Sequence, residues 1–384
     1  MNFSGLVVQL LNGLAGASSL FLVGAGLSLI FGVTRIVNFA HGSFYMLGVY
    51  LAYTLVDKLA GFGGAAWFWP ALLLAALAVG AIGALVEVLL LRRVYRAPEL
   101  FQLLATFALM LVIKDAALWL WGPEDLLGPR APGLTGAVDI LGRRFPTYDL
   151  FLIVVGPLVL GLLWLLLTRT RWGTLVRAAT QDREMVGALG VNQAWLFTAV
   201  FALGTMLAGL GGALQLPREP ANLGLDLLTI GDAFVVVVVG GMGSIPGAYV
   251  AALLIAEVKA ICIGIGAVEL FGIAFSFSKL TLVVEFLVMA VVLVVRPWGL
   301  LGRPQALSRN AGPAEAPLRR ADAPVKIAGA LLLIALLAWP VATASSPYLT
   351  VLAIDLLTAA LFAASLHFIM GPAGMHSFGH AAYF

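Results

Sequence analysis

Long apolar segments constrain this chain more than any other feature of its sequence. A helix needs roughly 20 residues to cross a hydrocarbon layer about 30 Å thick. Runs of that order lie near residues 6–31, 66–91, 99–120, 150–168, 195–215, 247–264, 280–296, 326–343 and 350–370. Residues 40–56 are expected to add a span, and residues 228–240 a short helix or a re-entrant segment. Because lipid cannot satisfy free backbone polar groups, the sequence predicts an all-α, polytopic transmembrane helical bundle.

Composition agrees with a membrane location. Of 384 residues, 62% are hydrophobic and 11% are charged, too few charges to cover the surface of a soluble domain. The net charge of +3 comes from basic residues in short loops, so no nucleic-acid partner is expected and lipid is expected to surround the bundle. The single cysteine, Cys262, excludes an intrachain disulfide and a cysteine-based zinc site.

Arginines in the loops orient the predicted spans. They follow the third and fifth spans: Arg92, Arg93 and Arg96, then Arg169, Arg171, Arg177 and Arg183. Both loops should face the cytoplasm, which places the long 121–149 loop and the N-terminus outside. Counting back, the polar hinge between the first two runs faces the cytoplasm.

A segment similar to this hinge, residues 35–48, occurs near the end of the chain. Asn38, His41 and Gly42 follow the first apolar run, and residues 375–384 place His380 between small residues after a later run. We interpret the repetition as a first membrane domain at 1–303 and the truncated start of a second at 326–384. Residues 304–325, rich in Pro, Ala, Arg and Glu, are expected to form a cytoplasmic linker.

The loop at 168–192 has the pattern of a short amphipathic helix ended by Gly190. Val176, Ala179, Arg183 and Gly187 fall roughly along one face, which a partner protein could receive in a groove. The alternative is a positive-inside loop whose helix has no partner.

A glycine-rich segment follows the valine run. Its residues include Gly240, Gly241, Gly243, Ser244, Pro246 and Gly247. No lysine follows these glycines, so the segment is not a phosphate-binding loop. We expect a helix break that lines a cavity, or a tight packing turn.

Ionisable residues in apolar segments are functional candidates, because the bilayer makes an unpaired charge costly. Nine residues qualify: Glu87, Lys114, Asp115, Asp232, Glu257, Lys259, Glu269, Lys279 and Glu285. Most lie near predicted span ends, where long side chains reach the interface. We retain Lys114, Asp115, Asp232 and Glu257, the first two being adjacent and therefore on different helix faces.

Neither His41 nor His380 has a further ligand at the spacing of a metal site, so no metal is expected. Both are interpreted as interfacial hydrogen-bonding residues that fix the start of a helix. No Ser-His-Asp or two-carboxylate arrangement is recognisable, so the chain is not expected to be an enzyme.

Three segments together carry a family resemblance: Gly26–Gly42, Gly240–Ala248 and Arg296–Gly302. With them the first 303 residues resemble LivH-type permeases of bacterial ABC importers for branched-chain amino acids. From about Ala323 the chain resembles the start of the companion LivM-type permease, whose early segment is matched by Ser377–Phe384. The whole is similar to a fused LivH–LivM protein that stops early.

The resemblance implies an inner-membrane permease that forms a translocation path for apolar amino acids. It implies cytoplasmic ATPase subunits, a second, LivM-like permease subunit and an extracytoplasmic substrate-binding protein as partners. ATP would be used by the partner subunits, and this chain would bind no cofactor. The ATPase-coupling segment would lie in the 177–192 loop, with these residues as candidates: Arg177, Ala178, Asp182, Gly187, Gly190 and Asn192.

Some residues depart from the family pattern. Asp232 stands where relatives commonly have a basic or neutral residue, and the pair Lys114-Asp115 is more charged than usual. A urea or short-chain amide permease therefore remains an alternative, although Phe39 in the hinge favours amino acids. An ion-coupled secondary transporter is the alternative from another class, motivated by the embedded charges.

Overall fold

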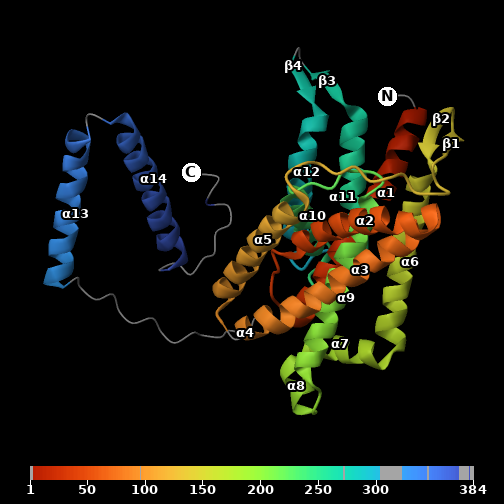
Figure 1. Ribbon diagram of the computed structural model, residues 1–384, viewed down its shortest axis with the longest axis horizontal. Coiled ribbons are helices and arrows are strands. Elements are labelled where there is room, and N and C mark those ends of the chain that lie inside the picture. Colours follow the sequence, from red (N-terminus) through yellow and green to blue (C-terminus); the bar gives the residue numbers. More distant parts are fainter. Residues whose placement is uncertain are drawn as a thin grey trace. The chain divides into compact units, whose positions relative to one another are not determined.

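The computed structural model describes residues 3–95, 97–270, 273–302, 322–343, 346–371 and 380 (Figure 1). Contacts divide the chain into two units, 1–306 and 307–384, which are described separately. Arg96, most of the predicted linker at 304–325 and most of the second histidine segment lie outside the described residues.

Helices make up nearly all of the first unit. They are α1 (Phe3–Thr34), α2 (His41–Gly63), α3 (Phe68–Val86), α4 (Arg92–Val94), α5 (Glu99–Trp121), α6 (Thr147–Arg169), α7 (Arg171–Gln181), α8 (Arg183–Ala188), α9 (Gln193–Gln215), α10 (Leu225–Gly240), α11 (Ile245–Ile265) and α12 (Thr281–Val295). A π-helical turn, Glu87–Leu91, joins α3 to α4. Two antiparallel hairpins pair β1 (Ala137–Ile140) with β2 (Arg143–Pro146) and β3 (Ala267–Leu270) with β4 (Ile273–Ser276).

Among the described residues, eight helices are long and apolar enough to span a membrane. They correspond to eight of the nine predicted runs, which confirms the all-α polytopic fold. The run at 280–296 is different, because its apolar helix covers only Val283–Val295. The expected span at 40–56 forms a helix, α2, that is not among the eight. Residues 228–240 belong to the short helix α10.

The ends of the helices alternate as the arginine pattern requires. Figure 1 places α4, α7 and α8 at one end of the first unit and the two hairpins and the N-terminus at the other. Arg92, after the π-helical turn, donates hydrogen bonds to Thr198 Oγ1 at 2.6 Å and to the Ala194 carbonyl at 3.4 Å near the start of α9. The two arginine-rich loops therefore share one end of the bundle, which we take as cytoplasmic.

Helix α1 lies in the core and packs against α6, α9, α10 and α11, and α9 also packs against α2 and α3. Glycines bring these helices unusually close. Gly26 of α1 faces the backbone of Gly204 of α9, and Gly48 of α2 faces that of Gly209. Since membrane helices gain little from hydrophobic association in lipid, such small-residue contacts supply van der Waals packing between them.

The second unit contains α13 (Ala323–Ala342) and α14 (Pro347–Met370). No residue in the most apolar stretch of either helix is buried within the described structure, so the pair requires lipid or further helices around it. His380 Nε2 lies 2.7 Å from Ser365 Oγ of α14, so this histidine bonds back to the helix that precedes it.

The glycine contact between α2 and α9 yields a matched test. Replacing Gly48 with alanine would push a methyl group into the Gly209 backbone, whereas Gly61 on the same helix faces open space. We expect Gly48→Ala to lower the free energy of unfolding by about 1–3 kcal/mol. Gly61→Ala, which gains helix propensity, should be neutral or stabilising. Thermal unfolding in detergent measures both, and equal midpoints would contradict the close contact.

Candidate functional site

The segment between α1 and α2 forms a sharp hinge. It begins at Arg35, whose φ of 58° lies in the left-handed region that non-glycine residues seldom adopt. Thr34 Oγ1 donates to the Ile30 carbonyl at 2.8 Å and accepts from the Ile36 amide at 3.3 Å, which closes the end of α1. The Asn38 side chain then accepts from the Ala40 amide at 3.1 Å, immediately before α2 begins. Local side-chain bonds therefore turn the chain back into the bundle.

His41, the first residue of α2, is completely buried, and its Nε2 lies 3.0 Å from the Val23 carbonyl. Val23 precedes the end of α1 by eleven residues, which is about 16 Å along a helix. The prediction of an interfacial histidine is therefore wrong in position, although its role in fixing the start of a helix is consistent with the bond. In the sequence, the charges of the loops assign the hinge to the cytoplasmic side. Nothing in the sequence indicates that the chain turns back into the bundle after α1.

Gly42 lets the hinge enter the core, since a Cβ at this position would overlap the Asp226 carbonyl of α10. Asp226 is itself fully buried, lies 3.6 Å from Lys114 Nζ and accepts a hydrogen bond from the Leu227 amide. Of the predicted embedded charges, Lys114 is thus paired, while the neighbouring Asp115 is exposed on another face. The Lys114–Asp226 pair has a structural role, because it holds the start of α10 beside the hinge.

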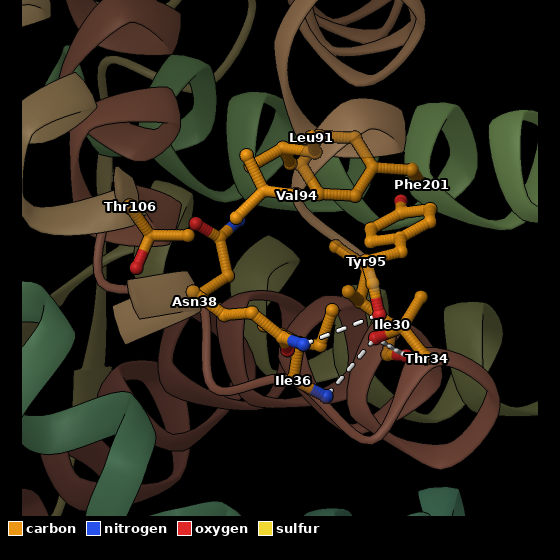
Figure 2. A pocket seen from close by; sticks show the side chains of 10 residues that line it. Ile30, Thr34, Ile36, Asn38, Leu91, Val94, Tyr95, Thr106 and Phe201 are labelled. Carbon is orange, nitrogen blue, oxygen red and sulfur yellow. Dashed lines mark hydrogen bonds between the residues drawn. The ribbon is translucent and has the colours of Figure 1, made fainter. Parts of the chain in front are cut away.

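A small pocket lies on the α9 side of the hinge (Figure 2). Ten residues line it: Ile30, Thr34, Ile36, Asn38, Leu91, Val94, Tyr95, Gln102, Thr106 and Phe201. Its volume of about 10 Å³ accommodates about one water molecule. The Asn38 amide nitrogen has no hydrogen-bond partner among the described residues. The pocket can hold a bridging water but not an amino acid.

A much larger cavity, which we call the outer cleft, lies among α1, α2, α10, α11 and α12. Its volume is about 490 Å³, within the range of ligand pockets. Sixteen residues line it: Gly16, Ser19, Leu20, Val23, Tyr45, Gln215, Glu219, Leu225, Leu227, Leu228, Thr229, Gly231, Asp232, Lys259, Glu285 and Phe286. Val23 and Tyr45 belong to the two helices that the hinge joins, and the Val23 carbonyl is the one that contacts His41.

Three charged side chains meet in the outer cleft. Lys259 Nζ lies 3.0 Å from Asp232 Oδ2 and also pairs with Glu285, joining α10, α11 and α12. Burial makes each isolated charge costly, so mutual pairing is what allows three of them in apolar helices. Asp232 was among the predicted site residues, whereas Lys259 and Glu285 were not, since each lies near the end of a predicted span. The apolar sequence on both sides of Lys259 could have indicated that this residue lies inside a span and needs a partner.

Glu257 behaves differently from this triad. It is half-buried, its carboxylate lies against the position of Gly13, and neither oxygen has a hydrogen-bond partner among the described residues. It does not line the outer cleft. The four embedded-charge candidates therefore occupy four environments and do not form one site.

The predicted coupling loop is two helices and not one. Asp182 ends α7 and caps α8, where its carboxylate accepts from the Met185 amide at 3.0 Å. Asn192 caps α9 in the same way, through the Trp195 amide at 3.1 Å. Gly190, with φ of 85°, turns the chain between these caps. The caps fix the segment's shape, since each satisfies a free helix N-terminal donor.

The exposed face of this segment also differs from the prediction. Val176 and Ala179 are buried within the chain and cannot serve as a free docking face. Met185 and Leu189 are instead 58% and 76% exposed on and just after α8. Gly187 contacts the Gln193 side chain, and Arg177 and Ala178 lie on α7. Two exposed apolar side chains on a capped, basic loop form a surface suited to a protein groove.

The glycine-rich segment forms the turn between α10 and α11. Gly241 and Gly243 adopt φ values of 101° and 84°. The Gly240 carbonyl accepts from the Leu301 amide at 3.1 Å, and the Gly241 backbone touches Gly302. Ser244 caps α11 by accepting from the Gly247 amide at 3.1 Å, and Pro246 lies in its first turn. None of these residues lines either cavity, which favours the packing-turn alternative.

No group of three or more His, Cys, Asp or Glu side chains gathers for a metal ion within the part of the chain that the structure describes. The chemistry of the outer cleft is therefore that of paired charges and apolar walls.

Comparison with known proteins gives a consistent result. Residues 9–293 match the family described as "Branched-chain amino acid transport system / permease component". The branched-chain amino acid permease BraD of Pseudomonas aeruginosa is 30% identical over 306 residues, covering 77% of this chain and 96% of BraD. LivH of Escherichia coli is 27% identical over 308 residues, covering 77% of this chain and 96% of LivH. No solved structure matches.

LivM of Escherichia coli is also similar, at 25% identity over 313 residues, covering 75% of this chain and 69% of LivM. These relatives are named as transport permeases, which favours the predicted function over the urea, amide and ion-coupled alternatives. The LivM match covers 75% of this chain and therefore includes most of the first unit, so it does not test the proposed fusion.

The buried hinge histidine provides a test of the site. His41→Ala removes the bond to Val23 and leaves a void at a fully buried position. We expect the free energy of unfolding to fall by about 2–4 kcal/mol. His367→Ala, at an exposed position of α14, should change it by less than about 0.5 kcal/mol. Unfolding in detergent, followed by intrinsic fluorescence, gives both values, and a stable His41→Ala variant would contradict the buried position.

Proposed function

This chain belongs to the permease components of branched-chain amino acid transport systems, and from that premise we propose that it is one permease subunit of an ATP-driven importer. It is a multi-pass inner-membrane protein. In the proposal it contributes one side of the translocation path, and a second, LivM-like permease subunit contributes the other. A substrate-binding protein delivers the amino acid from outside, and separate cytoplasmic subunits hydrolyse ATP.

The exposed face of α8 is the observation that carries the ATPase part of the proposal. Met185 and Leu189 project from a short, capped segment at the end of the bundle that holds the arginine-rich loops. Burying two such side chains in a groove of a partner would contribute roughly 1.5–3 kcal/mol each. The rigid caps would then pass a displacement of α8 to α9, whose first turn Asn192 caps.

This coupling segment is also connected to the hinge through packed residues. Gly32 of α1 lies against Gly243, and both are close to the Thr180 side chain of α7. A movement of the ATPase subunits would therefore reach α1 just before the hinge. We propose that this contact links ATP hydrolysis, carried out by the partner subunits, to rearrangement of the path.

The two-unit division supports a proposal about the second permease subunit. Within 307–384 the described residues form α13 and α14, and no residue in the most apolar stretch of either helix is buried. We propose that a full LivM-like chain completes the importer, and that the second unit is the beginning of a fused LivM-like domain. Expression of this chain with and without a separate LivM-like subunit tests the proposal.

The test of function is leucine uptake into proteoliposomes. The chain is reconstituted with its neighbouring ATPase, LivM-like and binding-protein partners, and ATP is supplied on the side of the ATPase. Uptake that requires ATP and the binding protein supports the importer. Uptake driven by an ion gradient without ATP would overturn it.

Variants of α8 test the coupling surface. We expect Leu189→Asp to reduce copurification of the ATPase at least about tenfold, since a charge would be desolvated in an apolar groove. Leu127→Asp is the control, because Leu127 is as exposed but lies in the loop between α5 and the β1–β2 hairpin, and Figure 1 shows that hairpin at the end opposite α8. Equal ATPase recovery with both variants would remove α8 from the interface.

The turn and cap of the same segment give a further prediction. Gly190→Pro, at φ of 85°, and Asp182→Lys, which removes the α8 cap, should preserve expression but uncouple ATP hydrolysis from uptake. Gly187→Ala is the milder control, since the neighbouring Gln193 side chain can move aside. Leucine transported per ATP hydrolysed is the measurement, and wild-type ratios in the first two variants would argue against a coupling role.

A further inference from the structure

The outer cleft brings together polar side chains from α9, α10, α11 and α12. We propose that it binds the zwitterionic backbone of an apolar amino acid during translocation, with Lys259 holding the carboxylate and Asp232 with Gln215 holding the ammonium group. The inference rests on the proposed function and adds the substrate-contacting residues to it.

The balance of charge in the cleft favours a ligand with an ammonium group. Glu219, Asp232 and Glu285 line the cleft, and Lys259 is the single cationic side chain among its lining residues. Glu285 is nearly inaccessible and is paired with Lys259, whereas the Asp232 side chain is 37% exposed. Of the two carboxylates paired with Lys259, Asp232 is therefore the one available to a ligand, and in a site of lowered dielectric its attraction to an ammonium group is strong.

Lys259 can hold a carboxylate while keeping its own partners. An ammonium group has three donors, and the pairs with Asp232 and Glu285 use two of them within the described structure. The remaining donor belongs to a side chain that is 23% exposed in the cleft. A charge-assisted hydrogen bond from this donor is the kind that recognises a substrate carboxylate.

Gln215 supplies an independent observation. It lines the cleft at the end of α9, is only 9% exposed, and its amide oxygen has no hydrogen-bond partner among the described residues. Its amide nitrogen donates to Glu219 Oε1 at 3.4 Å, which directs the other end of the amide away from that carboxylate. A buried acceptor left without a partner is costly, and a donor on a ligand would remove that cost.

The remaining lining matches an apolar side chain. Leu20, Val23, Leu225, Leu228 and Phe286 contribute hydrocarbon surface to the same cavity. A volume of about 490 Å³ exceeds what a single amino acid fills, so waters or a partner subunit would share it. The apolar wall lies beside one donor, Lys259, and two acceptors, Asp232 and Gln215. This combination matches neutral, apolar α-amino acids as the substrate class.

The location relative to the hinge agrees with a role in transport. Val23 lines the cleft through its side of α1, and its carbonyl bonds to His41. The small pocket that is lined by the hinge residues Ile36 and Asn38 holds about one water. A substrate in the cleft would therefore rest against a closed hinge until the helices rearrange.

The first experiment measures transport by the fully assembled importer carrying cleft variants. Asp232→Asn leaves the Lys259–Glu285 pair intact, and Gln215→Leu removes the free acceptor without changing charge. For each we expect leucine transported per ATP hydrolysed to fall by about tenfold, as for the loss of one hydrogen bond to a charged group. ATPase stimulation by the substrate-loaded binding protein should be unchanged. Glu257→Gln, on the same helix as Lys259 but outside the cleft, should retain the wild-type ratio.

The second experiment measures binding without relying on turnover. In a Cys262→Ala background, Thr229→Cys places a thiol in the cleft lining, where a small methanethiosulfonate reagent added from outside should modify it. Leucine at millimolar concentration should slow modification at least about fivefold. Leucinamide, which lacks the carboxylate, and 4-methylpentanoate, which lacks the amine, should protect much less.

The outcomes separate the two proposals. Wild-type importer that shows no ATP-dependent leucine uptake overturns the proposed function. Wild-type importer that transports leucine, with wild-type ratios in Asp232→Asn and Gln215→Leu, overturns the cleft alone. Equal protection by leucine and both analogues, or a thiol that the reagent cannot reach in the assembled importer, also overturns the cleft.

Discussion

Backbone-to-backbone contact between α1, α2 and α9 is the constraint on which the rest of the first unit depends. Gly26 and Gly204 let α1 approach α9, and Gly48 and Gly209 let α2 do the same. Without that approach the chain after Arg35 could not re-enter the bundle, and His41 could not reach the Val23 carbonyl. In a membrane, where apolar surface gains little by leaving lipid, this packing replaces the hydrophobic effect as the force that fixes helix positions.

The charges of the bundle follow from the same geometry. Asp226 is buried beside the hinge and paired with Lys114, which makes it part of the scaffold. Lys259 is shared by two carboxylates at the wall of a cavity, where part of it stays accessible. Both arrangements avoid an isolated charge in a medium of low dielectric. The second also lies in a cavity of about 490 Å³, large enough for a ligand, and the cleft is therefore the better candidate for a binding site.

Apolar run length and loop charge were sufficient to predict the helical fold and its membrane location, and the family resemblance of Gly26–Gly42, Gly240–Ala248 and Arg296–Gly302 predicted the transport family. They did not predict the return of the hinge, because the bond from His41 to Val23 and the Gly42–Asp226 contact are tertiary. The break at Asp182 was missed although its capping side chain is visible in the sequence, since helical periodicity continues through it. Lys259 was not predicted as a site residue, because its position within a predicted span does not indicate which residues of other helices lie beside it. Its partners, Asp232 and Glu285, come from α10 and α12.

The buried hinge is tested most directly by thiol accessibility in the assembled importer. In a Cys262→Ala background, Arg35→Cys should react readily with a membrane-impermeant maleimide from the cytoplasmic side, because Arg35 is exposed. Ser43→Cys, a nearly isosteric change eight residues later at a fully buried position, should remain unmodified from either side in the resting transporter. Modification of Ser43→Cys from the cytoplasm at the rate of Arg35→Cys would place the hinge at the membrane surface and contradict the account.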